Sequence, residues 1–130
     1  MAFHPPRKAQ EALLQERVVQ IIRLLGKPGL VWGASMSGVK LGIRAAMRMK
    51  KQGLNAGESD LWLLIDGQYY GIELKNGKEG RQSDVQKDFE RRVKLAGGAY
   101  FIARDLETAR YILESIGAIR PEAVRIGRAA

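Results

Sequence analysis

The segment Gly57–Lys75, which reads GESDLWLLIDGQYYGIELK, constrains the fold more than any other part of the sequence. Two strand-like runs, Leu61–Ile65 and Tyr69–Leu74, flank the dipeptide Asp66-Gly67. Asp-Gly between two such runs is a strong signal for a two-residue β-hairpin turn. Because the first run is apolar at every position, we expect a strand that is buried on both faces in the middle of a covered sheet.

The turn also sets the register of the hairpin, and the register places Glu73 opposite Asp60. Cross-strand neighbours have Cβ atoms about 5 Å apart, and two carboxylates that close repel unless a cation lies between them. Lys75 points to the same face as Glu73, because side chains alternate along a strand. Asp60 and Glu73 are therefore candidate metal ligands, with Lys75 converging on the same point, and the carbonyl of Leu74 is a candidate for a further oxygen ligand. A structural salt bridge between Lys75 and either acid is the alternative.

Composition narrows the choice of metal. The chain has one histidine and no cysteine, so thiolate ligands and thiol nucleophiles are excluded. Carboxylate ligands favour Mg²⁺ or Mn²⁺. Two carboxylates and a lysine in this arrangement suit phosphodiester hydrolysis. A bound metal can polarise the phosphate and lower the pKa of a water molecule, and the lysine can orient that water. The formal net charge of +8 indicates a polyanionic partner such as nucleic acid.

The rest of the chain predicts an α/β fold with a small mixed sheet flanked by helices. Ser83 and Gln86 have capping-box spacing at the start of one helix, and Asp105 suits the N-cap of another. Helices are expected over residues 8–25, 39–52, 83–96 and 106–116, and strands over residues 61–65, 69–74 and 99–103. Residues 30–32 are expected to form either a short strand or an extended segment.

A chain of 130 residues fits a single domain, and residues 1–7 and 120–130 are expected to be flexible or partner-facing ends. No apolar run is long enough to span a membrane, and the N-terminal residues lack the apolar block of a secretory signal. We therefore expect a cytoplasmic protein.

Two basic groups are candidates for contacts with DNA phosphates. One is a stripe on the second expected helix, whose members are three or four residues apart, and the other lies in the polar loop after Lys75. An ordinary solvated face is the alternative for the stripe. The residues are Lys40, Arg44, Arg48 and Lys51 in the stripe, and Lys78 and Arg81 in the loop.

The order of Asp60, a strand, a turn and Glu73-Leu74-Lys75 resembles the PD-(D/E)xK nuclease motif. Flanking segments resemble the VRR-NUC family of that superfamily, and the resemblance extends from about Glu11 to Ile116. An E-x-x-x-Q pattern on the first helix, Glu11–Gln15, also fits. The matching segments are GESDL (57–61), GIELK (71–75), GRQSDVQ (80–86) and GGAYFIAR (97–104).

This resemblance implies a restriction-endonuclease-like core and a Mg²⁺- or Mn²⁺-dependent endodeoxyribonuclease. Small members of the family, mostly phage or bacterial, are similar to homodimeric Holliday-junction resolvases, and larger relatives are flap or repair nucleases. Because this chain carries only the nuclease module, the junction activity is favoured, in the host cytoplasm if the protein is phage-encoded. The implied metal ligands are Asp60, Glu73, the Leu74 carbonyl and Glu11, and the implied catalytic residues are Asp60, Glu73, Lys75, Glu11 and Gln86.

Four positions leave questions open. Ser59 stands where the family usually has proline, a position that directs the backbone and does not bind metal. Gly33–Ser35 stands where many members carry asparagine. Glu16 is an alternative to Glu11, and Gln86 fits either a helix cap or a site residue.

Two other functions compete with a junction nuclease. A nuclease-like module that binds nucleic acid without cutting it needs no pair of close carboxylates, which would repel DNA. A sequence-specific restriction-type nuclease would need a recognition element that a chain of 130 residues has little room to supply. A homodimer is expected, because two symmetric cuts in a four-way junction need two sites.

Overall fold

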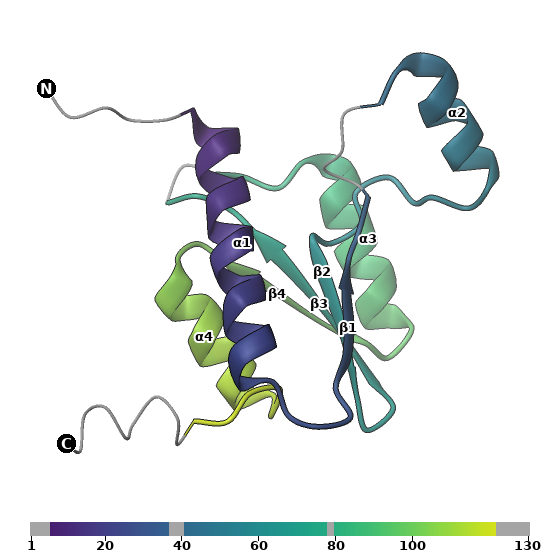
Figure 1. Cartoon of the computed structure of the whole chain (residues 1–130). Helices are drawn as coiled ribbons and strands as arrows, with labels where there is room; N and C mark the ends of the chain where they lie inside the picture. Colours follow the sequence, from purple (N-terminus) through teal and green to yellow (C-terminus); the bar gives the residue numbers. More distant parts are fainter. Residues whose placement is uncertain (1–5, 37–40, 78–79, 122–130) are drawn as a thin grey trace, which may run out of the picture. The chain divides into compact units, whose positions relative to one another are not determined.

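Over residues 6–36, 41–77 and 80–121, which the computed structural model describes, four strands form a mixed sheet and four helices flank it (Figure 1). The strand order is β1-β2-β3-β4, so the predicted α/β class is confirmed. The elements are α1 (Arg7–Leu25), β1 (Val31–Ala34), α2 (Ile43–Lys51), β2 (Leu61–Ile65), β3 (Gln68–Leu74), α3 (Asp84–Leu95), β4 (Ala99–Ala103) and α4 (Leu106–Ser115).

Internal contacts divide the chain into two units that are interleaved along the sequence. The first unit comprises Met1–Val31, Leu74–Gly80 and Ile102–Ala130, and the second comprises Trp32–Glu73 and Arg81–Phe101. The single domain expected from chain length stays a prediction.

The second unit contains the predicted hairpin. β2 and β3 are antiparallel, with Leu61 opposite Ile72 and Ile65 opposite Gln68. Asp66 and Gly67 form the turn with φ of 49° and 80°, and such positive φ values are typical of the turn type that Asp-Gly favours in hairpins. The predicted turn and register are confirmed.

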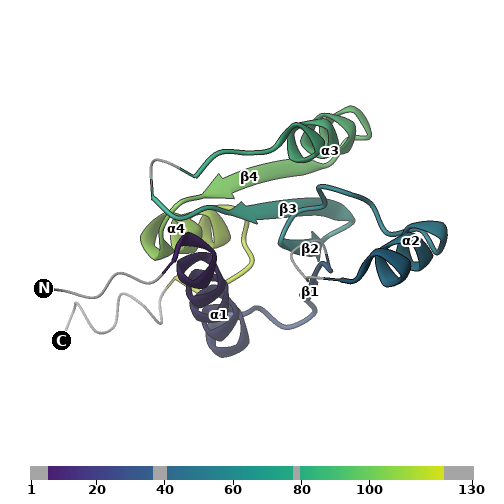
Figure 2. The same ribbon diagram turned by 90° about the horizontal axis from the view of Figure 1, so that it is seen from above.

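The predicted burial of β2 on both faces is wrong. Leu61 and Leu63 are buried on one face, but Leu64 on the other face is 42% exposed. The helix of this unit that covers the second face is α3, whose Phe89 packs against Tyr100 on β4, two strands away from β2 (Figure 2). Leu64 is apolar, but α3 does not pack over it. An apolar run in the sequence does not show which of its residues a helix will cover.

The connection from β3 to β4 passes through α3, and the arrows of β3 and β4 run in the same direction in Figure 2. This pair makes the sheet mixed, since β2 and β3 are antiparallel. The helix begins at the predicted capping box of Ser83 and Gln86, and Gly97, with φ of 94°, follows its C-terminus.

Helix α2 begins later than predicted. A start at residue 39 was expected, but Ile43 is the first helical residue. Gly42 has an extended backbone, with φ of −63° and ψ of 160°, so the expected start is wrong. Lys40 lies outside the described residues. No residue of α2 is buried, and α2 stands away from the strands of its own unit in Figures 1 and 2.

In the first unit, α1 and α4 pack against each other through apolar stripes. Each stripe follows the helical spacing expected from the sequence. The buried residues are Leu14, Val18 and Ile22 on α1, and Ala109, Ile112 and Leu113 on α4.

The chain after α4 contributes to this packing. Ile119 is buried and pairs with Gly26. Arg120 donates its backbone N–H to the carbonyl of Leu25 (3.0 Å) and its guanidinium to the carbonyl of Leu24 (3.2 Å). These carbonyls end α1 and lack helical partners, which explains why Arg120 is held in place.

Within the described ranges, no helix is both long and apolar enough to cross a membrane.

Gly57 has the most constrained glycine backbone near the hairpin. Its φ is 78°, and a Cβ atom there would overlap the carbonyl of Val85 and lie 2.7 Å from the backbone nitrogen of Gln86. The chain before β2 thus lies directly on the first turn of α3, where only glycine fits.

We predict that Gly57→Ala destabilises the protein more than Gly67→Ala. Both positions have φ near 80°, so both substitutions carry the left-handed backbone penalty of about 1–2 kcal/mol. Only Gly57 adds a clash, since nothing lies within 4 Å of an added Cβ at Gly67. Urea unfolding should show an additional loss of about 1–3 kcal/mol for Gly57→Ala. Equal stabilities of the two variants would contradict the close packing on α3.

Candidate active site

The buried carboxylate of Glu73, near the end of β3, is at the centre of the candidate site. Glu73 is only 1% exposed. The Nε2 of Gln86 donates to its Oε1 (3.0 Å), and the hydroxyl of Tyr100 donates to its Oε2 (2.7 Å). A buried carboxylate is costly unless it is hydrogen-bonded. The two donors stabilise the carboxylate and fix its orientation.

Gln86 both caps the start of α3 and donates a hydrogen bond to Glu73. Its Oε1 accepts a hydrogen bond from the backbone N–H of Ser83 (2.8 Å), and its backbone N–H donates to the Ser83 hydroxyl (3.3 Å). Because the amide oxygen points at the helix start, the amide NH₂ group points at Glu73. The capping box therefore aligns the donor for the site.

Tyr100 on β4 was not predicted from the sequence. Burial, and then the hydrogen bond to Glu73, raise the pKa of the Tyr100 hydroxyl well above its usual value, so it stays protonated and acts as a donor. Its ring packs edge-on against Phe89 of α3. The sequence did carry a signal, since a tyrosine within a strand expected to be buried needs a partner for its hydroxyl.

Asp60 immediately precedes β2, and one further step in the observed register places it opposite Glu73. The backbone N–H of Ser35 donates to the Asp60 carbonyl (3.0 Å). Next to it, Ser59 is buried and donates its hydroxyl to the carbonyl of Leu61 (2.9 Å). These contacts orient the backbone around Asp60, which is the role expected of the position that Ser59 occupies.

Glu11, Leu74 and Lys75 belong to the first unit. The backbone N–H of Asn76 donates to Oε1 of Glu11 (3.4 Å), so Glu11 lies beside the residue that follows Lys75. Lys75 is half-buried, and its backbone N–H donates to the carbonyl of Ala103 (3.0 Å). Glu16 is exposed. This geometry favours Glu11 over Glu16.

Arg104, like Tyr100, has a structural role that was not predicted from the sequence. Its guanidinium donates to the carbonyl of Gly77 (2.9 Å) and to that of Gly80. It therefore holds both ends of the loop that follows Lys75. Within and after this loop, Lys78 lies outside the described residues and Arg81 is exposed.

The stripe on α2 is accessible where it is described. Arg44, Arg48 and Lys51 are all exposed, so each can reach a phosphate. Whether any of them binds DNA stays a prediction.

The side chains around Glu73 suit a magnesium-type ion. Among the described residues, no group of three or more histidine, cysteine or acidic side chains is arranged to hold a metal. Mg²⁺ is usually bound by one or two carboxylates together with substrate phosphates. Asp60 and Glu73, opposite each other in the register, provide that number of carboxylates.

The fold matches solved structures described as VRR_NUC domains. One, "VRR_NUC domain protein", has a TM-score of 0.65 and 15% sequence identity, over 87% of this chain and 89% of the other. A second, "VRR_NUC domain", has a TM-score of 0.55 and 17% identity, over 84% of this chain and 97% of the other. The predicted resemblance is thus confirmed at the level of the fold. No family model matches the sequence, and neither does any curated protein.

We predict that Tyr100→Phe lowers stability by about 1–3 kcal/mol, because it removes a hydrogen bond to a buried charged group. The measurement is urea unfolding at pH 7. Tyr111→Phe is the matched control, since Tyr111 is 70% exposed, and it should change stability by less than about 0.5 kcal/mol. If Tyr100→Phe unfolds like the wild type, the hydroxyl is not needed to stabilise Glu73.

Proposed function

We propose that the protein is a divalent-metal-dependent DNA endonuclease that selects branched DNA and resembles a Holliday-junction resolvase. The observation that carries the proposal is the buried Glu73 carboxylate, held by two donors at the register position opposite Asp60. The fold shared with VRR_NUC domain structures supports the same class of activity.

Asp60 and Glu73 would hold Mg²⁺ or Mn²⁺, and Glu11 and the carbonyl of Leu74 are the further ligands predicted from the sequence. A divalent cation supplies polarisation of the phosphate and a lower pKa for a nearby water. Lys75 is proposed to orient the attacking water or to stabilise negative charge that develops on the phosphate.

The partners of Glu73 support a role in binding a cation. Gln86 and Tyr100 are both neutral donors, so they satisfy the carboxylate oxygens without cancelling the negative charge. Each donor is itself fixed, Gln86 by the capping box and Tyr100 by packing on Phe89. The chain therefore maintains an oriented, charged oxygen pair, which a binding module would not need.

DNA is proposed as the substrate because of the net charge of +8 and the exposed cations of α2. Arg44, Arg48, Lys51 and Arg81, with Lys40 and Lys78, would contact phosphates, which position DNA without reading its sequence. Selection would then depend on branch shape. A homodimer is proposed because paired cuts across a four-way junction need two sites.

We predict that Asp60→Asn abolishes cleavage while Asp66→Asn does not. Both substitutions remove one carboxylate from the same hairpin, but Asp66 belongs only to the turn. The assay uses end-labelled four-way junction, flap and linear duplex with Mg²⁺, Mn²⁺ or EDTA. Asp60→Asn should lose several kcal/mol of transition-state stabilisation, which corresponds to a decrease in cleavage rate of more than about a hundredfold.

Lys75→Ala and Glu73→Ala should lose activity similarly. Asp60→Asn is the cleaner test, because removing Glu73 also leaves the donors of Gln86 and Tyr100 without an acceptor. Cleavage in EDTA, or full activity of Asp60→Asn, would refute the assignment. Tight junction binding without cleavage in any metal would instead favour the non-cutting binding module.

A further inference from the structure

The positive charge of the protein is concentrated in one part of the chain. No Asp or Glu occurs between Glu16 and Glu58. The interval contains eight of the 22 Lys and Arg residues, and the other 14 are equal in number to the 14 acidic residues. The interval therefore carries the whole net charge of +8. Its cations are Arg17, Arg23, Lys27, Lys40, Arg44, Arg48, Lys50 and Lys51.

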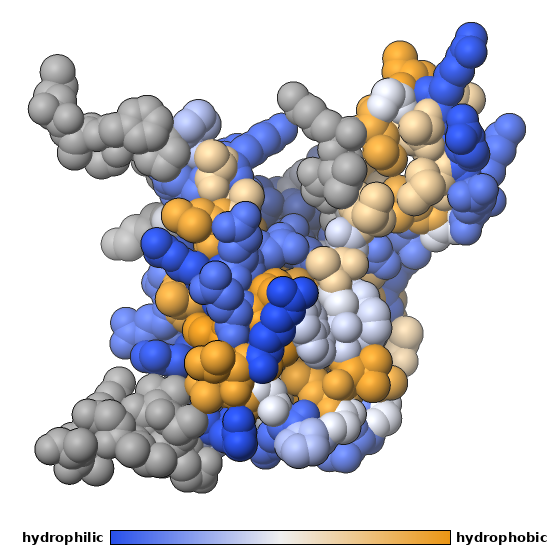
Figure 3. Space-filling view, in the orientation of Figure 1, coloured by the Kyte–Doolittle hydropathy of each residue, from blue (hydrophilic) through white to orange (hydrophobic). Residues whose placement is uncertain are grey.

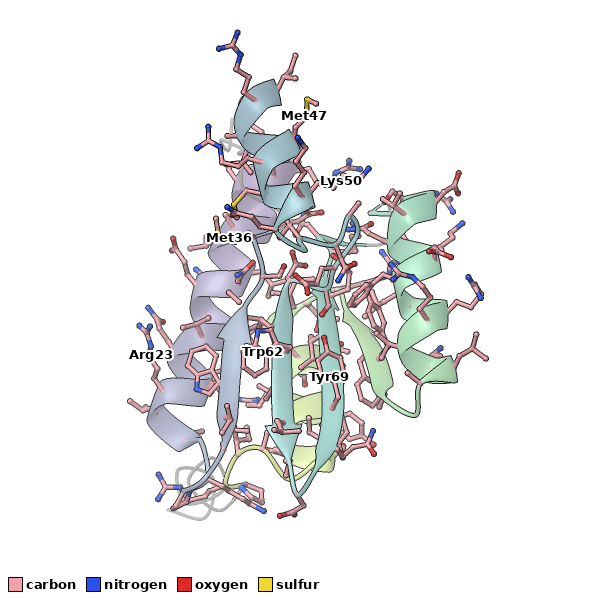
Figure 4. All side chains as sticks on the ribbon, turned by 90° about the vertical axis from the view of Figure 1, so that its right-hand side faces the viewer. Arg23, Met36, Met47, Lys50, Trp62 and Tyr69 are labelled. Carbon is pink, nitrogen blue, oxygen red and sulfur yellow. The ribbon has the colours of Figure 1, made fainter. Side chains whose placement is uncertain are left out.

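Helix α2, within this interval, also exposes apolar side chains. Ile43 is 81% exposed and Met47, one turn further on, is 58% exposed. Apolar and charged surface lie side by side over α2 in Figure 3, and Figure 4 shows Met47 and Lys50 on α2, away from the strands that carry Trp62 and Tyr69. Single apolar side chains scattered over a surface need no explanation, but two large ones exposed next to each other indicate a binding surface.

The cations lie directly beside this apolar edge. Arg44, Arg48 and Lys51 recur every three or four residues and form the neighbouring stripe of the helix. Ala45 and Met49, on the opposite side, are only half-exposed. The helix thus presents an apolar edge, Ile43 with Met47, flanked by cations.

Charge decides between the two occupants that such an edge could take. If α2 packed on α2 of a second copy, the cations of both helices would come together with no acid on either helix to pair with them. DNA has the opposite charge, and each phosphate neutralised by a cation releases a counterion. The composition of α2 therefore favours DNA over a second copy.

We propose that the edge formed by Ile43 and Met47 inserts as an apolar wedge at the branch point of the DNA, while Arg44, Arg48 and Lys51 hold the adjoining phosphates. Ile and Met are among the side chains that insert between base steps, and in a duplex this requires unstacking, which costs about a few kcal/mol per step. At a branch point the stack is already interrupted. The wedge therefore gives a preference for branched over linear DNA, and it rests on the proposed function.

The test measures binding in EDTA, so that no cleavage occurs, with 2-aminopurine placed at the branch of a four-way junction. Wild-type protein should increase its fluorescence by unstacking the base. Ile43→Ala/Met47→Ala should lose this increase and lower the preference for junction over duplex by about tenfold, because apolar contact is lost. The slope of affinity against salt should not change.

Two controls separate the wedge from the charges. Arg44→Gln/Arg48→Gln should weaken binding to junction and duplex alike and reduce the salt slope by about one per cation removed. Leu95→Ala removes an exposed apolar side chain from the end of α3 and should change neither signal. Because no residue of α2 is buried, the α2 variants should fold normally.

The inference fails if Ile43→Ala/Met47→Ala keeps the fluorescence increase and the junction preference. It also fails if the double variant converts a DNA-free dimer to a monomer in sedimentation, since a second copy would then cover the edge. Either result leaves the nuclease assignment standing. Wild-type protein that binds no DNA at all would instead refute the proposed function itself.

Discussion

The hydrogen-bonded burial of the Glu73 carboxylate is the interaction on which the candidate site depends. A carboxylate removed from water needs donors, and here they come from α3 and β4. Three elements of the second unit must be in place before the charge can be buried at acceptable cost. Folding of that unit therefore also orients the carboxylate.

The features that could be predicted from the sequence are set by residues close together in the chain. Asp66 and Gly67 adopt positive φ, and this one turn determines the register that places Asp60 opposite Glu73. The start of α3 follows in the same way from Ser83 and Gln86, three residues apart. Local backbone chemistry thus predicted the register of the hairpin and the start of α3.

The features that could not be predicted depend on which distant segments meet. The apolar run of β2 did not reveal that Leu64 would be exposed, because α3, which covers that face, packs over β4, two strands away from β2. Tyr100 was recognisable as a buried residue, but its partner is 27 positions away. Arg120 looked like part of a basic tail, although it binds the carbonyls that end α1. Periodicity identifies a face, and only packing identifies what lies against it.

The proposed site would hold a cation between two acids while the protein binds DNA, and these are opposite demands because carboxylates repel phosphates. The excess of positive charge lies in one interval of the chain. The interval between Glu16 and Glu58 contains no acid, so its cations cannot form ion pairs with side chains of that interval. Gln86 and Tyr100, which donate to Glu73, are neutral, so these two contacts orient the carboxylate without adding a positive charge beside it. A cation held there would in turn reduce the repulsion that a bound phosphate experiences, which links DNA binding to metal binding through charge alone.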